Sequence, residues 1–149
     1  MAGRSLQVAL VAASLVCTVV FGVIAYHAVA ASRAQEAPAP AAVRAAFDDA
    51  ARTWRSHADL PVHRVVLVSA EEYGSGTYLF VFDVYTWFGI GSGYATSGPE
   101  TRTCGDAGWI RNGGFVGLGE IASSDGLRET RVSCAQRFGP GRVLTIPRA

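Results

Sequence analysis

The chain has 149 residues, half of them hydrophobic and 17% charged, and its formal net charge is +1. This length predicts one domain with additional segments, and the near-neutral charge argues against a nucleic acid or another polyanion as the partner. All thirteen basic residues are Arg, and this preference, together with abundant Ala, Gly and Val, is typical of a bacterial protein from a high-GC genome.

A stretch without Asp, Glu, Lys or Arg extends from Leu6 to Ala31. As a helix it would measure roughly 39 Å at about 1.5 Å per residue, which is enough to cross a bilayer core of about 30 Å. Arg4 and the amino terminus place positive charge before the stretch, which favours a cytoplasmic N-terminus and a C-terminal part outside the cytoplasm. We therefore expect residues 1–31 to be a single transmembrane anchor in the cell membrane, with residues 6–31 in contact with lipid.

A cleaved signal peptide is the alternative for the same stretch. Ala28, Val29 and Ala30 form a small-x-small sequence of the kind that signal peptidases cleave. Cleavage there would give a secreted protein. The apolar stretch is longer than the usual signal-peptide core of about 7–15 residues, which favours the uncleaved anchor.

A linker and a helix follow the anchor. Residues 32–42 read SRAQEAPAPAA, and their Ala-Pro repeats predict an extended spacer before a domain over 43–149. From about Ala41 to Ser56, apolar residues recur at helical spacing, at Val43, Phe47, Ala50 and Trp54. This stripe predicts a helix packed on a sheet. Membrane-surface binding is the weaker alternative, because the polar face carries both signs of charge.

The segment VHRVVLVSA, residues 62–70, is apolar and rich in β-branched residues, which predicts a first strand. Tyr78–Phe88 alternates as the next strand. One face, with Phe80 and Phe82, is the natural core side, and the other carries Leu79, Val81, Asp83, Tyr85 and Trp87.

That second face is unusually apolar for a face in contact with water, because Asp83 is its only charged residue. We expect Tyr85 and Trp87, with Asp83, to form part of a binding surface, because aromatic residues often anchor interfaces. The glycines in GIGSG, residues 89–93, would let a partner approach the backbone closely. The alternative is that both faces are buried, one under the helix and one under C-terminal strands.

The C-terminal third predicts further antiparallel strands. Asn112-Gly113 and Asp125-Gly126 are each typical of a two-residue hairpin turn. The second turn would place Glu120 opposite Arg131 as a cross-strand pair. Residues 142–146 would form the last strand.

Cys104 and Cys134 are the only cysteines of the predicted extracytoplasmic part. An oxidising compartment favours a disulfide between them over two buried thiols. A metal site is not predicted, because two cysteines thirty positions apart, with only His57 and His63 as further candidates, match no zinc-binding spacing.

Motifs for catalysis are weak. GIGSG lacks the last glycine of the dinucleotide pattern GxGxxG, and no Ser-His-acid arrangement can be recognised. Asp83 is the one candidate for carboxylate chemistry, although an ion pair with Arg64 or Arg102 is the simpler interpretation. We therefore predict no catalytic residue, no metal and no cofactor.

The predicted fold class is α+β: the N-terminal transmembrane helix, then one helix packed on a curved antiparallel sheet of five to seven strands, with a β-sandwich as the alternative. The layout over Ala41–Ala135 is similar to cystatin-like and NTF2-like folds, in architecture only. Where cystatins carry QxVxG, this chain reads EYGSG at residues 72–76, so the resemblance does not imply protease inhibition.

These features favour a membrane-anchored extracytoplasmic binding or accessory protein that engages a protein or envelope partner without catalysis. The alternative function is a small anchored or secreted enzyme that uses a carboxylate around Asp83.

Overall fold

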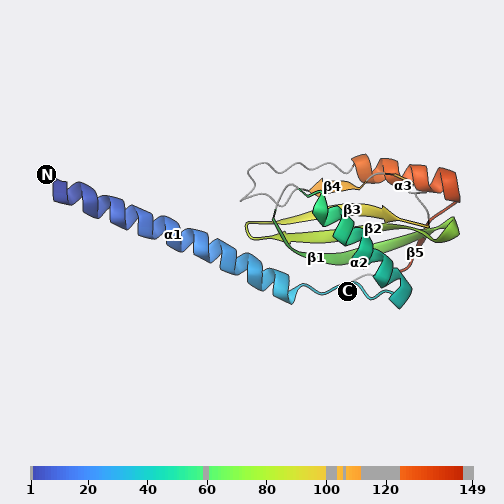
Figure 1. Ribbon diagram of the computed structural model, residues 1–149, viewed down its shortest axis with the longest axis horizontal. Coiled ribbons are helices and arrows are strands. Elements are labelled where there is room, and N and C mark those ends of the chain that lie inside the picture. Colours follow the sequence, from blue (N-terminus) through green and yellow to red (C-terminus); the bar gives the residue numbers. More distant parts are fainter. Residues whose placement is uncertain (1, 59–60, 100–103, 106, 112–124, 146–149) are drawn as a thin grey trace.

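The computed structural model describes residues 2–58, 61–99, 104, 105, 107–111 and 125–145. These residues form three helices and one open, antiparallel, five-stranded sheet (Figure 1), so the predicted α+β class is confirmed and a β-sandwich is not what they build. In chain order the elements are α1 (Ala2–Arg33), α2 (Ala41–Ser56), β1 (Val62–Tyr73), the short 3₁₀ helix η1 (Gly74–Gly76), β2 (Thr77–Thr86), β3 (Ile90–Ser97), β4 (Gly108–Arg111), α3 (Asp125–Phe138) and β5 (Arg142–Val143).

Helix α1 is long and apolar enough to cross a membrane over Gln7–Arg33. Its large apolar side chains, including Val8, Leu15 and Phe21, are exposed rather than packed against the domain. Such a helix would be unfavourable in water and is suited to lipid. A signal sequence has the same character, so the helix agrees with either of the two predictions for this segment.

The strand order of the sheet is β4-β3-β2-β1-β5. Strand β2 lies at its centre and forms hairpins with both neighbours. The β1–β2 hairpin closes through η1, where Gly76 has a φ of 71° that favours glycine. The β2–β3 hairpin closes after Thr86 and pairs without interruption from Tyr85 opposite Ile90 to Tyr78 opposite Ser97.

Helix α2 covers one face of the sheet, as its apolar stripe predicts. Val43, Phe47, Ala50 and Trp54 are buried. Phe47 packs edge-to-face on Phe80 of β2, with ring centroids 5.5 Å apart. This layer is the main hydrophobic core and matches the predicted core face of β2.

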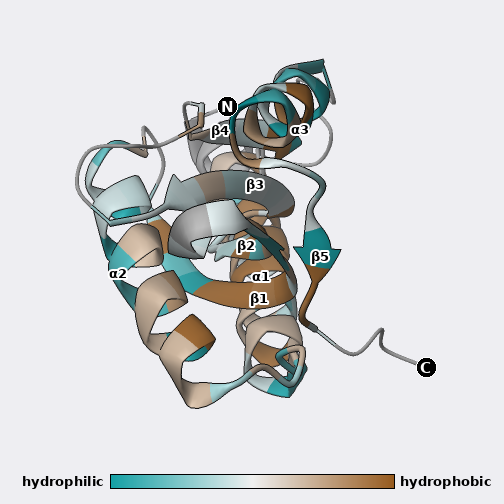
Figure 2. Cartoon of the chain, turned by 90° about the vertical axis from the view of Figure 1, so that its right-hand side faces the viewer, coloured by the Kyte–Doolittle hydropathy of each residue, from teal (hydrophilic) through white to brown (hydrophobic). Residues whose placement is uncertain are grey.

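The opposite face of the sheet is covered by two other helices at different places. The side chain of Leu79 is fully buried in a cluster with Leu127 of α3. Nearer the β2–β3 turn, Tyr85 packs against Ala31 at the end of α1. Figure 2 shows α2 and α3 on opposite sides of the sheet.

Helix α3 replaces the predicted second hairpin. Asp125-Gly126 begins the helix instead of forming a β-turn, so the pairing of Glu120 with Arg131 is wrong, because Arg131 lies within α3. Glu120 and the predicted turn at Asn112-Gly113 lie outside the described residues. The last strand is shorter than predicted and comprises Arg142 and Val143 paired with Glu72 and Glu71 of β1.

The segment between α1 and α2 has no helix or strand over residues 34–40, and it lies against the domain. Ala37 is buried, and its backbone N–H donates to the carbonyl oxygen of Leu67 in β1 at 2.9 Å. Glu36 forms an ion pair with Arg44 of α2. These contacts place the segment along the edge of β1.

Candidate functional site

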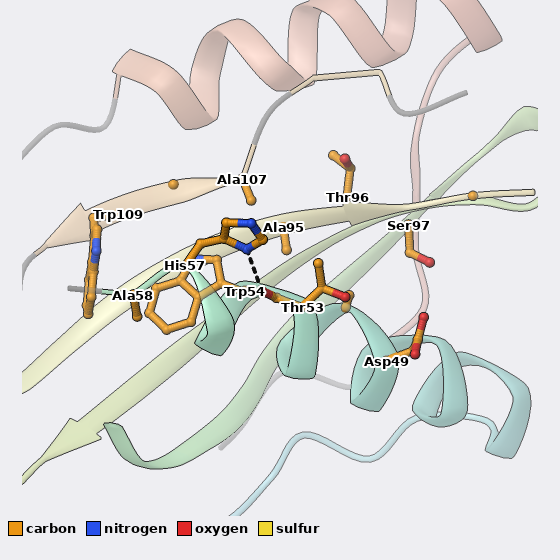
Figure 3. Close-up of a pocket in the computed structure, with 13 residues that line it drawn as sticks. Asp49, Thr53, Trp54, His57, Ala58, Ala95, Thr96, Ser97, Ala107 and Trp109 are labelled. Atoms are coloured by element: carbon orange, nitrogen blue, oxygen red, sulfur yellow. Dashed lines mark hydrogen bonds between the residues drawn. The ribbon is translucent and has the colours of Figure 1, made fainter. Parts of the chain in front are cut away.

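A cleft of about 660 Å³ opens between the C-terminal half of α2 and the strands β3 and β4 (Figure 3). Its walls are small, aromatic and hydroxyl-bearing residues, namely Asp49, Ala50, Thr53, Trp54, His57, Ala58, Ala95, Thr96, Ser97, Gly98, Ala107, Gly108 and Trp109. This volume lies within the range of about 300–1,000 Å³ that is usual for small-molecule sites.

The periodicity of α2 explains its contribution to the cleft. Asp49, Thr53 and His57 follow one another at four-residue spacing and are exposed. They flank the buried stripe that includes Ala50 and Trp54. One helix therefore supplies an apolar wall and a polar rim side by side.

Two tryptophans form the aromatic part of the cleft. Trp109, on β4, packs edge-to-face against Trp54, with ring centroids 4.7 Å apart. Trp54 also packs edge-to-face on Phe82 of β2, at 5.1 Å. Trp54 is buried while Trp109 is half-buried, so Trp109 presents more of its ring to the cleft.

Gly93, the last glycine of the GIGSG sequence, makes room for this aromatic layer. A Cβ atom on Gly93 would lie 2.7 Å from Cε2 of Phe82 and 3.1 Å from Cζ2 of Trp54. The first contact is shorter than packed side chains tolerate, and the second would require Trp54 to shift slightly. At Gly93 it is thus the chain's own aromatic side chains, and not an outside partner, that approach the backbone.

The polar groups of the cleft are partly engaged. Nδ1 of His57 lies 2.9 Å from the carbonyl oxygen of Thr53 and 3.1 Å from the hydroxyl oxygen of Ser56, and the tautomer with its proton on Nδ1 donates to that carbonyl. In the neutral ring, Nε2 is then the hydrogen-bond acceptor. Asp49 forms an exposed ion pair with Arg52 at 3.1 Å. The hydroxyl of Thr96 donates to the carbonyl oxygen of Gly105 at 2.9 Å.

This arrangement suits recognition better than covalent chemistry. It combines aromatic and small apolar surface with a few hydrogen-bonding groups that could orient a guest molecule. Within the described parts of the chain, no group of three or more His, Cys, Asp or Glu side chains could hold a metal ion.

The three residues predicted to form a binding surface are not in this cleft. Asp83 lies on the opposite face of β2 and accepts a hydrogen bond from the hydroxyl of Ser92 at 3.2 Å. Tyr85 is 8% exposed and is covered by Ala31, so it does not reach an open surface. Trp87 is 38% exposed, because the strand ends at Thr86 and Trp87 belongs to the turn. The structure thus separates Trp87 from the buried Tyr85, and a binding role for Asp83 and Trp87 stays a prediction.

Sequence reasoning missed the cleft residues on β3 and β4, above all Thr96, Ser97 and Trp109. These residues come together only through the antiparallel pairing of β4 on β3, where Trp109 is opposite Gly93. The sequence did contain one signal for the cleft, namely the polar residues Asp49, Thr53 and His57 beside the apolar stripe of α2. They mark the side of the helix that is not packed on the sheet.

Cys104 and Cys134 form the predicted disulfide, with a Cα–Cα distance of 4.7 Å. Both cysteines are buried, and the bridge joins the segment before β4 to α3. It therefore holds α3 on the sheet near the strand that carries Trp109.

Comparisons of the chain with protein families, with curated proteins and with solved structures found no match.

Proposed function

We propose that the protein is a single-pass membrane protein whose domain lies outside the cytoplasm and binds a protein or envelope component in the α2–β3–β4 cleft. The observation that carries this proposal is the cleft itself, with its paired tryptophans and hydroxyl rim. Most of its wall residues belong to helix α2 and to strands β3 and β4, and such elements position binding groups more firmly than loops do.

Two features support the location. Helix α1 has the length and composition of a membrane span, and the disulfide is typical of proteins outside the cytoplasm.

The cleft chemistry suggests the kind of group that it receives. Ala50, Ala95 and Ala107 leave space, while Trp109 offers an aromatic surface and Ser97 and His57 offer hydrogen bonds. We propose that the guest is an uncharged, partly apolar group, such as a side chain of a partner protein or a ring of an envelope component. The cystatin- or NTF2-like layout is proposed on the same basis, because α2 lies across the sheet with the cleft beside it.

Site-specific photo-cross-linking in the intact membrane tests this proposal. A photoreactive phenylalanine at Thr96 should capture the partner, whereas the same group at Val132, an exposed position on α3, should not. Trp109→Ala should reduce capture from position 96 at least several-fold. Equal capture from both positions, or capture unaffected by Trp109→Ala, would remove the cleft from the binding site.

The alternative enzyme around Asp83 has less support. Its carboxylate is bonded to Ser92 and lies on the face of the sheet opposite the cleft. A catalytic carboxylate needs a substrate cavity beside it, and this cleft does not include Asp83.

A further inference from the structure

A tight turn joins β2 to β3 and holds two aromatic side chains at its tip. The N–H of Thr86 donates to the carbonyl oxygen of Gly89 at 2.9 Å. The Thr86 hydroxyl oxygen accepts from the N–H of Gly89 at 2.9 Å and from the N–H of Phe88 at 3.3 Å. Because Thr86 and Gly89 are buried, Trp87 and Phe88 project from a firmly bonded base.

Trp87 and Phe88 are 38% and 36% exposed. Among the large hydrophobic residues described outside α1, the others that are exposed are the aliphatic Val132 and Val143. The ring of His63 packs at a tilt against that of Trp87, with ring centroids 4.5 Å apart. Two adjacent exposed rings are unfavourable in water, and a partner that covers them would remove this cost.

The tip of this turn, formed by Trp87 and Phe88, lies at the end of the sheet where α1 meets the domain. Ala31 belongs to one packed cluster with Tyr85 and Ile90, which pair with each other next to the turn. In Figure 1 the β2–β3 turn lies at the left edge of the sheet, on the side toward which α1 extends. If α1 spans a bilayer, the tip therefore faces that bilayer.

Helix length sets the depth of the tip. A helix from Leu6 to Ala25 would measure about 30 Å, the thickness of a bilayer core. The next residue, Tyr26, is 68% exposed and is of a type enriched at membrane interfaces. Trp87 lies two residues beyond Tyr85, which corresponds to about 7 Å of extended chain. Tyr26 lies five residues before Ala31, which also corresponds to about 7 Å along a helix. With α1 and β2 both directed along the bilayer normal, Trp87 and Tyr26 would lie at similar depth.

We propose that Trp87 and Phe88 enter the outer interface of the bilayer that α1 spans, so that the domain touches the membrane at a second point. Trp is suited to this position, because its ring is apolar and its indole N–H can bond to water or headgroups. The proposal rests on the anchoring part of the proposed function and is independent of the cleft. A second contact would hold the domain in one orientation above the membrane.

Spin labels on the full-length protein in phosphatidylcholine–phosphatidylglycerol vesicles test the contact. One label replaces Phe88, as Phe88→Cys in a Cys17→Ala background. A matched label replaces Val143, as Val143→Cys in the same background, on a strand that pairs at the opposite end of β1. A third sample carries the label on the native Cys17, which is exposed on α1 and reports whether this helix is in lipid. Collision rates with oxygen and with a water-soluble nickel chelate give the depth of each label.

We expect the ratio of oxygen to nickel collisions at position 88 to exceed that at position 143 several-fold. Adding Trp87→Ser should move the label at 88 toward the aqueous value. If the label at Cys17 lies in lipid but the label at position 88 is exposed to water, the tip contact alone is overturned. If the label at Cys17 is itself exposed to water, the membrane anchor is overturned. Low accessibility of position 88 to both reagents, with dipolar broadening between labels, would instead show a contact between copies and also overturn the proposal.

Discussion

The guanidinium of Arg64 donates a hydrogen bond to the carbonyl oxygen of Ala31, 33 positions earlier in the chain, at 2.5 Å. Ala31 lies in the last turn of α1, where carbonyl groups have no partner within the helix. A cation at this end also interacts favourably with the helix dipole. One bond thus joins α1 to the first strand of the domain.

Enlarging Ala31 should loosen this junction. Ala31→Leu adds three carbon atoms at a fully enclosed site, where overpacking costs about 1–3 kcal/mol. We expect trypsin to cleave after Arg33 faster in detergent-solubilised Ala31→Leu than in the parent protein. Ser32→Leu, at an exposed neighbour, is the control and should cleave at the parent rate. Equal rates for both variants would mean that Ala31 is not a firm contact.

Removing the disulfide should destabilise the domain strongly. The bridge spans a sequence separation of 30, and the chain-entropy model assigns a loop of this size about 3–4 kcal/mol. Helix α3 buries few residues besides Cys134, chiefly Leu127 and Thr130, so it depends on the bridge. Urea unfolding of the Cys104→Ala, Cys134→Ala double variant measures the loss. Cys17→Ala should leave the unfolding midpoint unchanged, and an equally small change for the double variant would contradict the prediction.

Alkaline pH should weaken the domain through Tyr73. Burial, and then the hydrogen bond from its hydroxyl to Glu71 at 2.8 Å, raise the pKa of Tyr73 to about 12. The nearby Arg131, which bonds to Glu71, opposes this rise. The folded state therefore holds the phenol proton more tightly than the unfolded state, whose tyrosine pKa is about 10.

The sign of the pH dependence follows from this difference. The contribution of Tyr73 to stability is fully present below about pH 10 and is lost as the pH rises toward 12. Tyr73→Phe should make the free energy of unfolding fall less steeply between pH 10 and 12. Parallel profiles for Tyr73→Phe and the parent protein would argue against the bond to Glu71.

Gly93→Ala should disturb the core beneath the cleft. The added methyl group would meet the rings of Phe82 and Trp54 at less than packing distance, and the cost should be about 1–3 kcal/mol. Near-ultraviolet circular dichroism should change as well, because Trp54 must shift against Trp109. Ser97→Ala on the same strand is the control and should leave both signals close to those of the parent. An unaltered spectrum and midpoint for Gly93→Ala would contradict the packing of Trp54 on β3.

The sequence was informative where one segment carried the whole pattern. The stripe from Val43 to Trp54 predicts α2 correctly, because its apolar positions recur at helical spacing within a single element. The faces of β2 were assigned correctly for Phe80 and Phe82. The cleft was not predictable in this way, because Thr53 and Trp109 meet only through the packing of α2 on β3 and the pairing of β4 with it.

Helix α3 shows why a local signal can mislead. Asp125-Gly126 suits a two-residue hairpin turn, but an acidic residue also suits the first turn of a helix. The deciding pattern was Leu127, Thr130 and Cys134 at helical spacing, followed by Gly139 with a φ of 92° and then Pro140. Glycine and proline at this place are typical helix-end residues. The apolar stripe of α3 is narrow because the Cys104–Cys134 disulfide supplies part of the attachment of this helix to the sheet.

The segment 34–40 has a consequence for how the sheet behaves in a crowded solution. An uncovered strand edge offers its N–H and C=O groups to a neighbouring molecule and so favours aggregation. Along β1, the N–H of Ala37 donates to the carbonyl oxygen of Leu67, and the N–H of Leu144 donates to that of Ala70. A chain shortened to begin at Val43 would lose the first of these covers, although it would keep every buried residue of the main core cluster, which begins at Val43. Such a soluble fragment should self-associate through β1, whereas one that begins at Ala34 should stay monomeric.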